Sequence, residues 1–157
     1  MVLQLPIHLV NLTGLLSLLR IVWTILRERD GSMAKKNCMI LAIDDDPDVL
    51  NTLRIVLEAN GYQMVEAYSA EEGLKKYKEK TPDFILVDMM MEAVDAGLNF
   101  VREIRLLNNK SPVYMLSSVG DNLNQTASYT ELGLDGVLQK PVNSNTLLKI
   151  IQAKIKL

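Results

Sequence analysis

Polar side chains of three chemical kinds follow four of the apolar runs in this sequence, each close to the point where the run ends. They are three carboxylates, one hydroxyl and one ammonium group. In chain order these residues are Asp44, Asp45, Asp88, Ser117 and Lys140. Carboxylates held close together repel one another, and a hard divalent cation such as Mg²⁺ relieves that repulsion. If the fold gathers these residues, the set predicts a magnesium site.

The same residue types match phosphoryl transfer to a carboxylate. The ammonium of Lys140 can neutralise a phosphoryl oxygen as a point charge, and the Ser117 hydroxyl can donate a hydrogen bond to another oxygen. Such a transfer requires mainly positioning and charge stabilisation, and an Asp nucleophile that forms an aspartyl phosphate is an established covalent strategy. Acids at strand ends also serve as solvated helix N-caps, and we expect that role for Asp46.

Strands and helices that alternate along residues 38–157 must position these side chains. Continuous apolar runs indicate strands buried on both faces, and we expect strands over 38–43, 64–67, 84–87, 113–116 and 136–138. We expect helices after Asp46-Pro47 and after Ser69, over 98–107, in a more polar stretch ending at Gly133, and over 145–157. Pro47 suits a first helical turn, and Ser69 with Glu72 forms a capping box.

This alternation, with its short connections, implies an α/β fold in which helices cover both faces of a parallel sheet. The carboxyl ends of parallel strands meet at one edge, where such folds hold their sites. We therefore expect Asp44, Asp45, Asp88, Ser117 and Lys140 to converge at that edge.

Composition narrows the classes of function. The chain has 157 residues, which suggests one domain with a short extension, and its net charge of −2 does not favour nucleic-acid binding through a basic patch. Cys38 is the single cysteine, so an intrachain disulfide and a cysteine-based zinc site are excluded, and a reduced, cytoplasmic compartment is the simpler interpretation. His8 is the single histidine, which leaves little material for a histidine-based site.

Residues 1–26 differ from the rest of the chain because they are rich in Leu, Ile and Val and contain no acidic residue. We place a boundary near Ser32, with a hydrophobic N-terminal extension over 1–32 and the main domain over 33–157. A secretory signal peptide fits poorly, because the segment lacks a positive start and a small-residue cleavage site.

Three interpretations of this extension stay open. Its length allows a transmembrane helix, interrupted by polar residues. A polar stripe at three- and four-residue steps instead predicts an amphipathic helix on a membrane or a partner; its members are Thr13, Ser17, Arg20, Thr24 and Arg27. Alternatively, Met33 is the native start and residues 1–32 are not native.

Three motifs make the main domain resemble the receiver domain of bacterial response regulators, over about residues 37–157. They are Ile40-Leu41-Ala42-Ile43-Asp44-Asp45-Asp46-Pro47, Phe84-Ile85-Leu86-Val87-Asp88-Met89-Met90-Met91 and Lys140-Pro141. The resemblance implies a flavodoxin-like, doubly wound five-stranded parallel sheet with strand order 2-1-3-4-5.

The resemblance also implies a role for each site residue. Asp88 matches the phosphoacceptor, and Asp44 and Asp45 match the acidic pair that holds Mg²⁺ together with Asp88. The backbone carbonyl of Met90 completes that metal site. Ser117 matches the switch hydroxyl, and Lys140 matches the lysine that pairs with the phosphoryl group, before a cis bond to Pro141.

Three features depart from the family pattern. Glu92 stands where the family usually has proline. The usual Met-Asp-Gly is stretched as Val94-Asp95-Ala96-Gly97, so the loop is one residue longer. Val137 replaces an aromatic residue in the fifth strand, which puts the usual coupling of the hydroxyl to an aromatic side chain in doubt.

The resemblance implies a signalling switch rather than an enzyme: a sensor histidine kinase or phosphotransfer protein donates the phosphoryl group, and a downstream protein responds. No output domain follows the last expected helix, so we expect the output to be a protein–protein contact or onward phosphotransfer. Two alternatives stay open. A haloacid-dehalogenase-type phosphatase would use Asp44 as its nucleophile, although Asp88 would then have no role. A receiver-like module could also bind partners without phosphorylation.

Overall fold

A computed structural model describes residues 38–155, apart from 92, 94 and 119–130. Its centre is a sheet of five parallel strands in the order β2-β1-β3-β4-β5, which confirms the predicted fold class and strand order. The strands are β1 (Met39–Ile43), β2 (Gln63–Ala67), β3 (Phe84–Asp88), β4 (Val113–Ser117) and β5 (Gly136–Gln139).

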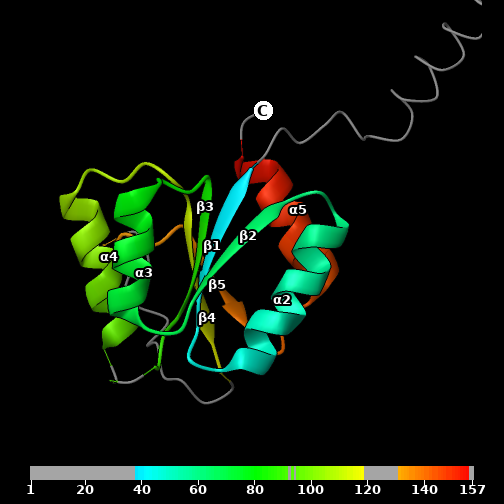
Figure 1. Ribbon diagram of the computed structural model, residues 1–157, viewed down its shortest axis with the longest axis horizontal. Helices are drawn as coiled ribbons and strands as arrows, with labels where there is room; N and C mark the ends of the chain where they lie inside the picture. Colours follow the sequence, from blue (N-terminus) through cyan, green and yellow to red (C-terminus); the bar gives the residue numbers. More distant parts are fainter. Residues whose placement is uncertain (1–37, 92, 94, 119–130, 156–157) are drawn as a thin grey trace, which may run out of the picture. The chain divides into compact units, whose positions relative to one another are not determined.

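Helices cover both faces of the sheet, as Figure 1 shows. One face carries α2 (Pro47–Ala59) and α5 (Ser144–Lys154), and the other carries α3 (Ala70–Glu79) and α4 (Ala96–Leu106). Because side chains alternate across a strand, β1 contributes Ile40 and Ala42 to the core beneath α2 and α5, and Leu41 and Ile43 to the core beneath α3 and α4. This two-sided burial explains why β1 is apolar along its whole length.

The two predicted N-caps are confirmed, with one difference in detail. Asp46 caps α2, because its Oδ1 accepts a hydrogen bond from the Asp48 backbone N–H at 2.9 Å. Ser69 caps α3, and its Oγ accepts from the Glu72 N–H at 3.1 Å. Glu72, however, reaches past the cap residue and accepts from the backbone N–H of Tyr68 at 2.8 Å.

Some element ends differ from the sequence-based expectation by a few residues. α4 begins at Ala96, two residues before the expected 98. The prediction missed the start because the apolar spacing on which it was based begins at Leu98. α5 ends at Lys154 rather than at the expected 157. The helix expected before Gly133 and the extension over 1–32 lie outside the described residues. Within the described part of the chain, no helix has the length and apolar character needed to cross a membrane.

Candidate functional site

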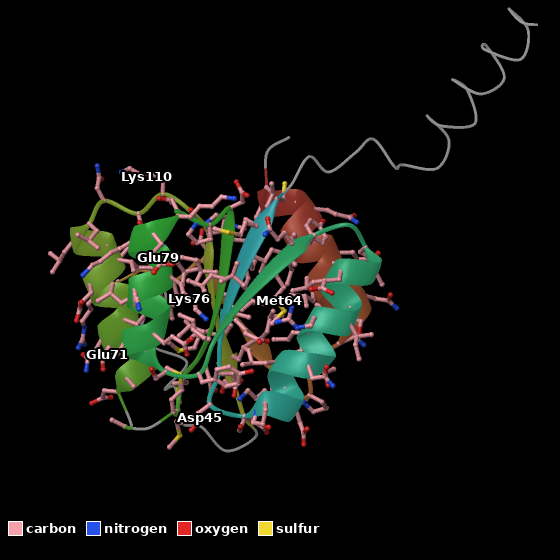
Figure 2. All side chains as sticks on the ribbon, viewed as in Figure 1. Asp45, Met64, Glu71, Lys76, Glu79 and Lys110 are labelled. Atoms are coloured by element: carbon pink, nitrogen blue, oxygen red, sulfur yellow. The ribbon has the colours of Figure 1, made fainter. Side chains whose placement is uncertain are left out.

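The register of the sheet brings the predicted site residues to one edge. Ile43 of β1 pairs with Val87 of β3, so Asp44 and Asp88 follow at the same level on adjacent strands. The register of β4 and β5 brings two more of them to the same edge, since Ser117 pairs with the residue before Lys140. Figure 2 shows Asp45 at this end of the molecule and Lys110, which precedes β4, at the opposite end. The expected convergence is therefore found.

The ammonium group of Lys140 lies between two carboxylates. Its Nζ is 2.7 Å from Asp44 Oδ2 and 3.0 Å from Asp88 Oδ1. The Asp44 side chain is fully buried, and the Lys140 side chain is 18% exposed, so both charges are largely removed from water. Ion pairs screened so little by water interact more strongly than surface pairs.

Asp44 is held in place by the turn that follows it. Its Oδ1 accepts a hydrogen bond from the Asp46 backbone N–H at 2.9 Å. Its Oδ2 contacts Lys140 as an ion pair, but no hydrogen bond of good geometry reaches this buried oxygen from the described residues. A buried oxygen that accepts no hydrogen bond lowers the stability of the fold, and a bound cation would compensate for the missing bond.

Three carboxylates are close enough to share one cation. Asp44, Asp45 and Asp88 each offer an oxygen, and these oxygens lie within 4.8 Å of one another. Asp45 is exposed, whereas the other two are buried, so the cluster is open to solvent on one side. Three negative charges face one ammonium, and oxygen ligands of this kind suit Mg²⁺. The residues present therefore fit a magnesium ion.

Burial sets the protonation behaviour of this cluster. The pKa of Asp88 is raised, chiefly because its carboxylate is removed from water; the pairing with Lys140 opposes this effect, and repulsion from Asp44 adds to it. Burial also lowers the pKa of Lys140, but the contacts with Asp44 and Asp88 outweigh burial and the net shift is upward. Lys140 therefore keeps its positive charge in this site.

Ser117 and Met90 are the two remaining predicted site residues. Ser117 is buried at the end of β4, and its Oγ donates to the Ser118 carbonyl at 3.3 Å. The Lys140 N–H donates to the Ser117 carbonyl at 2.7 Å, which ties the ends of β4 and β5 together. The bond from Lys140 to Pro141 is cis, as expected. Met90 lies in the loop after β3, and its side chain is 46% exposed.

A family model described as the response regulator receiver domain matches residues 40–152. The chain belongs to this family. The receiver domain is the phosphorelay module of two-component signalling, and receiver domains are in general signalling modules rather than enzymes. The resemblance drawn from the three motifs is thereby confirmed.

Two curated relatives illustrate the match of this receiver domain. The transcriptional regulatory protein GlrR of Escherichia coli is 31% identical over 119 residues, which are 76% of this chain and 26% of GlrR. The alkaline phosphatase synthesis transcriptional regulatory protein PhoP of Bacillus subtilis is 28% identical over 120 residues, which are 76% of this chain and 49% of PhoP. The chain thus spans about a quarter to a half of the length of these relatives.

Solved structures of receiver domains have the same fold. The chemotaxis protein CheY4 of Vibrio cholerae is 28% identical, with a TM-score of 0.67 over 75% of this chain and 98% of CheY4. A response regulator receiver domain protein of Clostridium thermocellum is 30% identical, with a TM-score of 0.68 over 75% of this chain and 94% of that protein.

An apolar groove beside the acidic cluster of this receiver domain was not predicted from sequence. It has a volume of about 200 Å³ and lies between α2 and the start of α5, and Lys140 is one of its lining residues. Its apolar lining includes Val49 and Val56 from α2 and Val142 before α5. The sequence shows only that α2 carries apolar residues at these positions. The groove forms because α5 packs beside α2.

Val137 takes the position at which receiver domains usually carry an aromatic residue. It is partly buried and packs against the core beneath α3 and α4. On the other face of the sheet, in the core beneath α2 and α5, Tyr114 of β4 stacks on Phe84 of β3, with ring centroids 5.2 Å apart and an angle of 15° between the planes. Gly136 makes room for that ring, since a Cβ there would lie 2.5 Å from Tyr114 Cε1.

Proposed function

We propose that Asp88 accepts a phosphoryl group in a Mg²⁺-dependent transfer, and that phosphorylation switches the contacts of this receiver domain with a downstream protein. The position of Lys140 is the observation that supports this proposal most strongly. Its ammonium contacts Asp88 and the fully buried Asp44 at the same time, at 3.0 and 2.7 Å. A structural ion pair would need one carboxylate, whereas two carboxylates and a third nearby leave excess negative charge for a cation.

Each side chain has a role that its position allows. Asp88 attacks phosphorus through a carboxylate oxygen, and the bond from phosphorus to the leaving imidazole nitrogen or other donor group breaks. Lys140 neutralises charge on the phosphoryl oxygens, and the Ser117 hydroxyl donates to one of them. Asp44, Asp45, Asp88 and the Met90 carbonyl would hold Mg²⁺, and the bound ion would supply positive charge to offset that of the phosphoryl group.

A sensor histidine kinase or a phosphotransfer protein is the proposed donor. The apolar groove supports this choice because Lys140 lines it, so a donor protein seated there brings its phosphorylated side chain close to the acidic cluster. The response passes to a downstream protein partner rather than to nucleic acid, consistent with the net charge of −2. We place the domain over 33–157 in the cytoplasm, with membrane contact only if residues 1–26 are native.

Intact-mass analysis tests the proposal directly. The protein is incubated with a small phosphodonor such as acetyl phosphate and Mg²⁺, alongside Asp88→Asn, the exposed-site control Asp48→Asn, and a sample with EDTA. One added phosphoryl group is expected on the wild type and on Asp48→Asn, and none on Asp88→Asn or with EDTA.

Two other results would contradict the proposal in different ways. No adduct on folded wild type with Mg²⁺ present would support a module that binds partners without phosphorylation. An adduct that persists in Asp88→Asn would place the nucleophile at Asp44, as in a haloacid-dehalogenase-type phosphatase.

A further inference from the structure

Gly97, the second residue of α4, lies directly against the main chain of Asp88. A Cβ added to Gly97 would be 2.2 Å from the Asp88 carbonyl oxygen, 3.2 Å from the Asp88 carbonyl carbon and 3.3 Å from Met89 Cα. Cβ atoms essentially never come within 3.0 Å of such an atom. The hydrogen that the Cβ would replace therefore points at the Asp88 carbonyl oxygen.

The contact, and not the backbone conformation, is what requires glycine at this position. Gly97 has helical geometry, and its φ is outside the left-handed region where glycine is favoured. Alanine is a better helix former than glycine. Glycine is thus less favourable for the helix itself, but it fits the close contact between α4 and the backbone of Asp88.

Two other glycines are crowded, but by side chains. A Cβ on Gly73 would meet Ile43 Cδ1 at 2.4 Å, and a Cβ on Gly136 would meet Tyr114 Cε1 at 2.5 Å. A side chain can change rotamer without moving the backbone. The atom that faces Gly97 belongs to the backbone and can give way only if the backbone of Asp88 moves or the whole first turn of α4 moves.

The sheet leaves the Asp88 backbone little freedom to move away. Asp88 pairs with Leu116 of β4, and the next N–H, that of Met89, donates to the Leu116 carbonyl at 3.0 Å. On the helix side, Ala96 is buried at the start of α4. The phosphoacceptor backbone is therefore held between β4 and the first turn of α4.

We propose that Gly97 is a positioning residue for the phosphoacceptor: its missing side chain lets α4 rest on the Asp88 carbonyl and so sets where the Asp88 carboxylate and the Met90 carbonyl lie. This inference rests on the proposed function. A side chain at residue 97 must push the two backbones apart by about 1 Å, since ordinary C···O contacts are about 3.3 Å or longer. A displacement of this size at a reacting group costs up to about 100-fold in rate.

The test compares Gly97→Ala with Gly136→Ala, a control whose added methyl group lies nearest to the Tyr114 side chain. Mg²⁺ affinity is measured by titration calorimetry, and the phosphorylation rate is measured against phosphodonor concentration. For Gly97→Ala we expect a Mg²⁺ Kd about tenfold higher and a maximal rate lowered by about 10- to 100-fold, with little change in the donor concentration at half-maximal rate.

The control separates positioning from loss of stability. Gly136→Ala should retain wild-type Mg²⁺ affinity and maximal rate even if its unfolding midpoint falls as far as that of Gly97→Ala. Wild-type Mg²⁺ affinity and maximal rate in a folded Gly97→Ala protein would overturn the inference and leave the proposed function standing. If the wild type binds no Mg²⁺ and accepts no phosphoryl group, the proposed function fails and the inference fails with it.

A second measurement applies if Gly97→Ala does not fold. In the wild type, Mg²⁺ should shift the backbone amide NMR signals of Gly97 and Leu98. The proposed ligands of the ion include Asp88 and the Met90 carbonyl, and α4 packs against the backbone of Asp88. Signals near Arg105, at the other end of α4, should not move. If the Asp44 and Asp45 amides respond to Mg²⁺ while those of Gly97 and Leu98 stay fixed, α4 is not coupled to the site and the inference is wrong.

Discussion

Lys140 reaches Asp88 across the end of an intervening strand: its Nζ lies 3.0 Å from Asp88 Oδ1, although β4 separates β3 from β5 in the sheet. The Lys140 side chain therefore lies over the carboxyl edge, where it also meets Asp44 at 2.7 Å. Among the described residues, Lys140 is the one lysine whose ammonium group contacts the acidic cluster. The proposed chemistry of the site depends on this ammonium group.

Replacing Lys140 should slow phosphorylation of Asp88. We expect Lys140→Met to lower the rate by about 100-fold or more, because it removes a charged donor from a partly buried site where charge moves during transfer. Lys140→Arg keeps the charge but not the point-like geometry, so its rate should be intermediate. The exposed Lys149→Met serves as the control and should react like the wild type. Phosphorylation time courses by intact mass provide the rates, and an unchanged rate in Lys140→Met would remove Lys140 from the mechanism.

Magnesium should stabilise the fold through Asp44. At ten times its Kd, Mg²⁺ should raise the free energy of unfolding by about 1.4 kcal/mol, because it binds the folded site and not the unfolded chain. Asp44→Asn should abolish this gain, and Asp48→Asn, a change at an exposed residue of α2, should retain it. Urea unfolding followed by circular dichroism, with Mg²⁺ or with EDTA, measures the difference. Equal stabilisation of all three proteins would place the ion elsewhere.

The ion pair between Arg54 of α2 and Glu66 of β2 should stabilise the fold in a pH-dependent way. The pKa of Glu66 is lowered, first by the hydrogen bond from Arg54, with burial opposing it. A lowered folded pKa means that this stabilisation is complete above the unfolded value near 4.5 and is lost as pH falls through the folded value. Arg54→Gln should remove it, at a cost below about 1 kcal/mol for a partly exposed pair.

Unfolding midpoints measured from pH 3 to pH 7 (roughly the range over which carboxylates titrate) test the Glu66 prediction. The gap between wild type and Arg54→Gln should be constant at neutral pH and should narrow in acid. The matched control is Arg102→Gln, whose guanidinium donates only to Asn99 among the contacts found, at 3.2 Å. A gap that does not depend on pH would mean that Arg54 stabilises the fold by packing and not through the Glu66 charge.

Arg105 should be the most costly surface arginine to replace. Its guanidinium donates to the Gly133 carbonyl at 2.9 and 2.6 Å, to the Asn109 carbonyl at 3.1 Å and to Asp135 at 3.2 Å. A lysine cannot reproduce these several bonds, so Arg105→Lys should lower the free energy of unfolding by about 1–3 kcal/mol. Arg102→Lys should change it by less than about 0.5 kcal/mol. Chemical denaturation ranks the two, and an equal, small effect would show that the guanidinium bonds contribute little.

The strands and the polar residues at their ends could be predicted from sequence for a physical reason. A strand buried on both faces must be apolar along its length, so its end is visible where a charged residue such as Asp44 or Asp88 interrupts the run. Parallel pairing then requires these ends to meet at one edge. The N-caps Asp46 and Ser69 were predictable because a cap bonds to a backbone N–H only two or three residues away.

By itself, therefore, the sequence determined the fold class, the strand order through the family motifs, and which side chains gather at the carboxyl edge. Only the tertiary structure decided how they meet. The reach of Lys140 over β4 to Asp88 and to the buried Oδ2 of Asp44 joins segments far apart in the chain. The contact of Gly97 with the Asp88 carbonyl depends on how α4 packs on the end of β3. Such contacts depend on how strands and helices pack to within about an ångström, and residue types and spacing carry no record of distances on that scale.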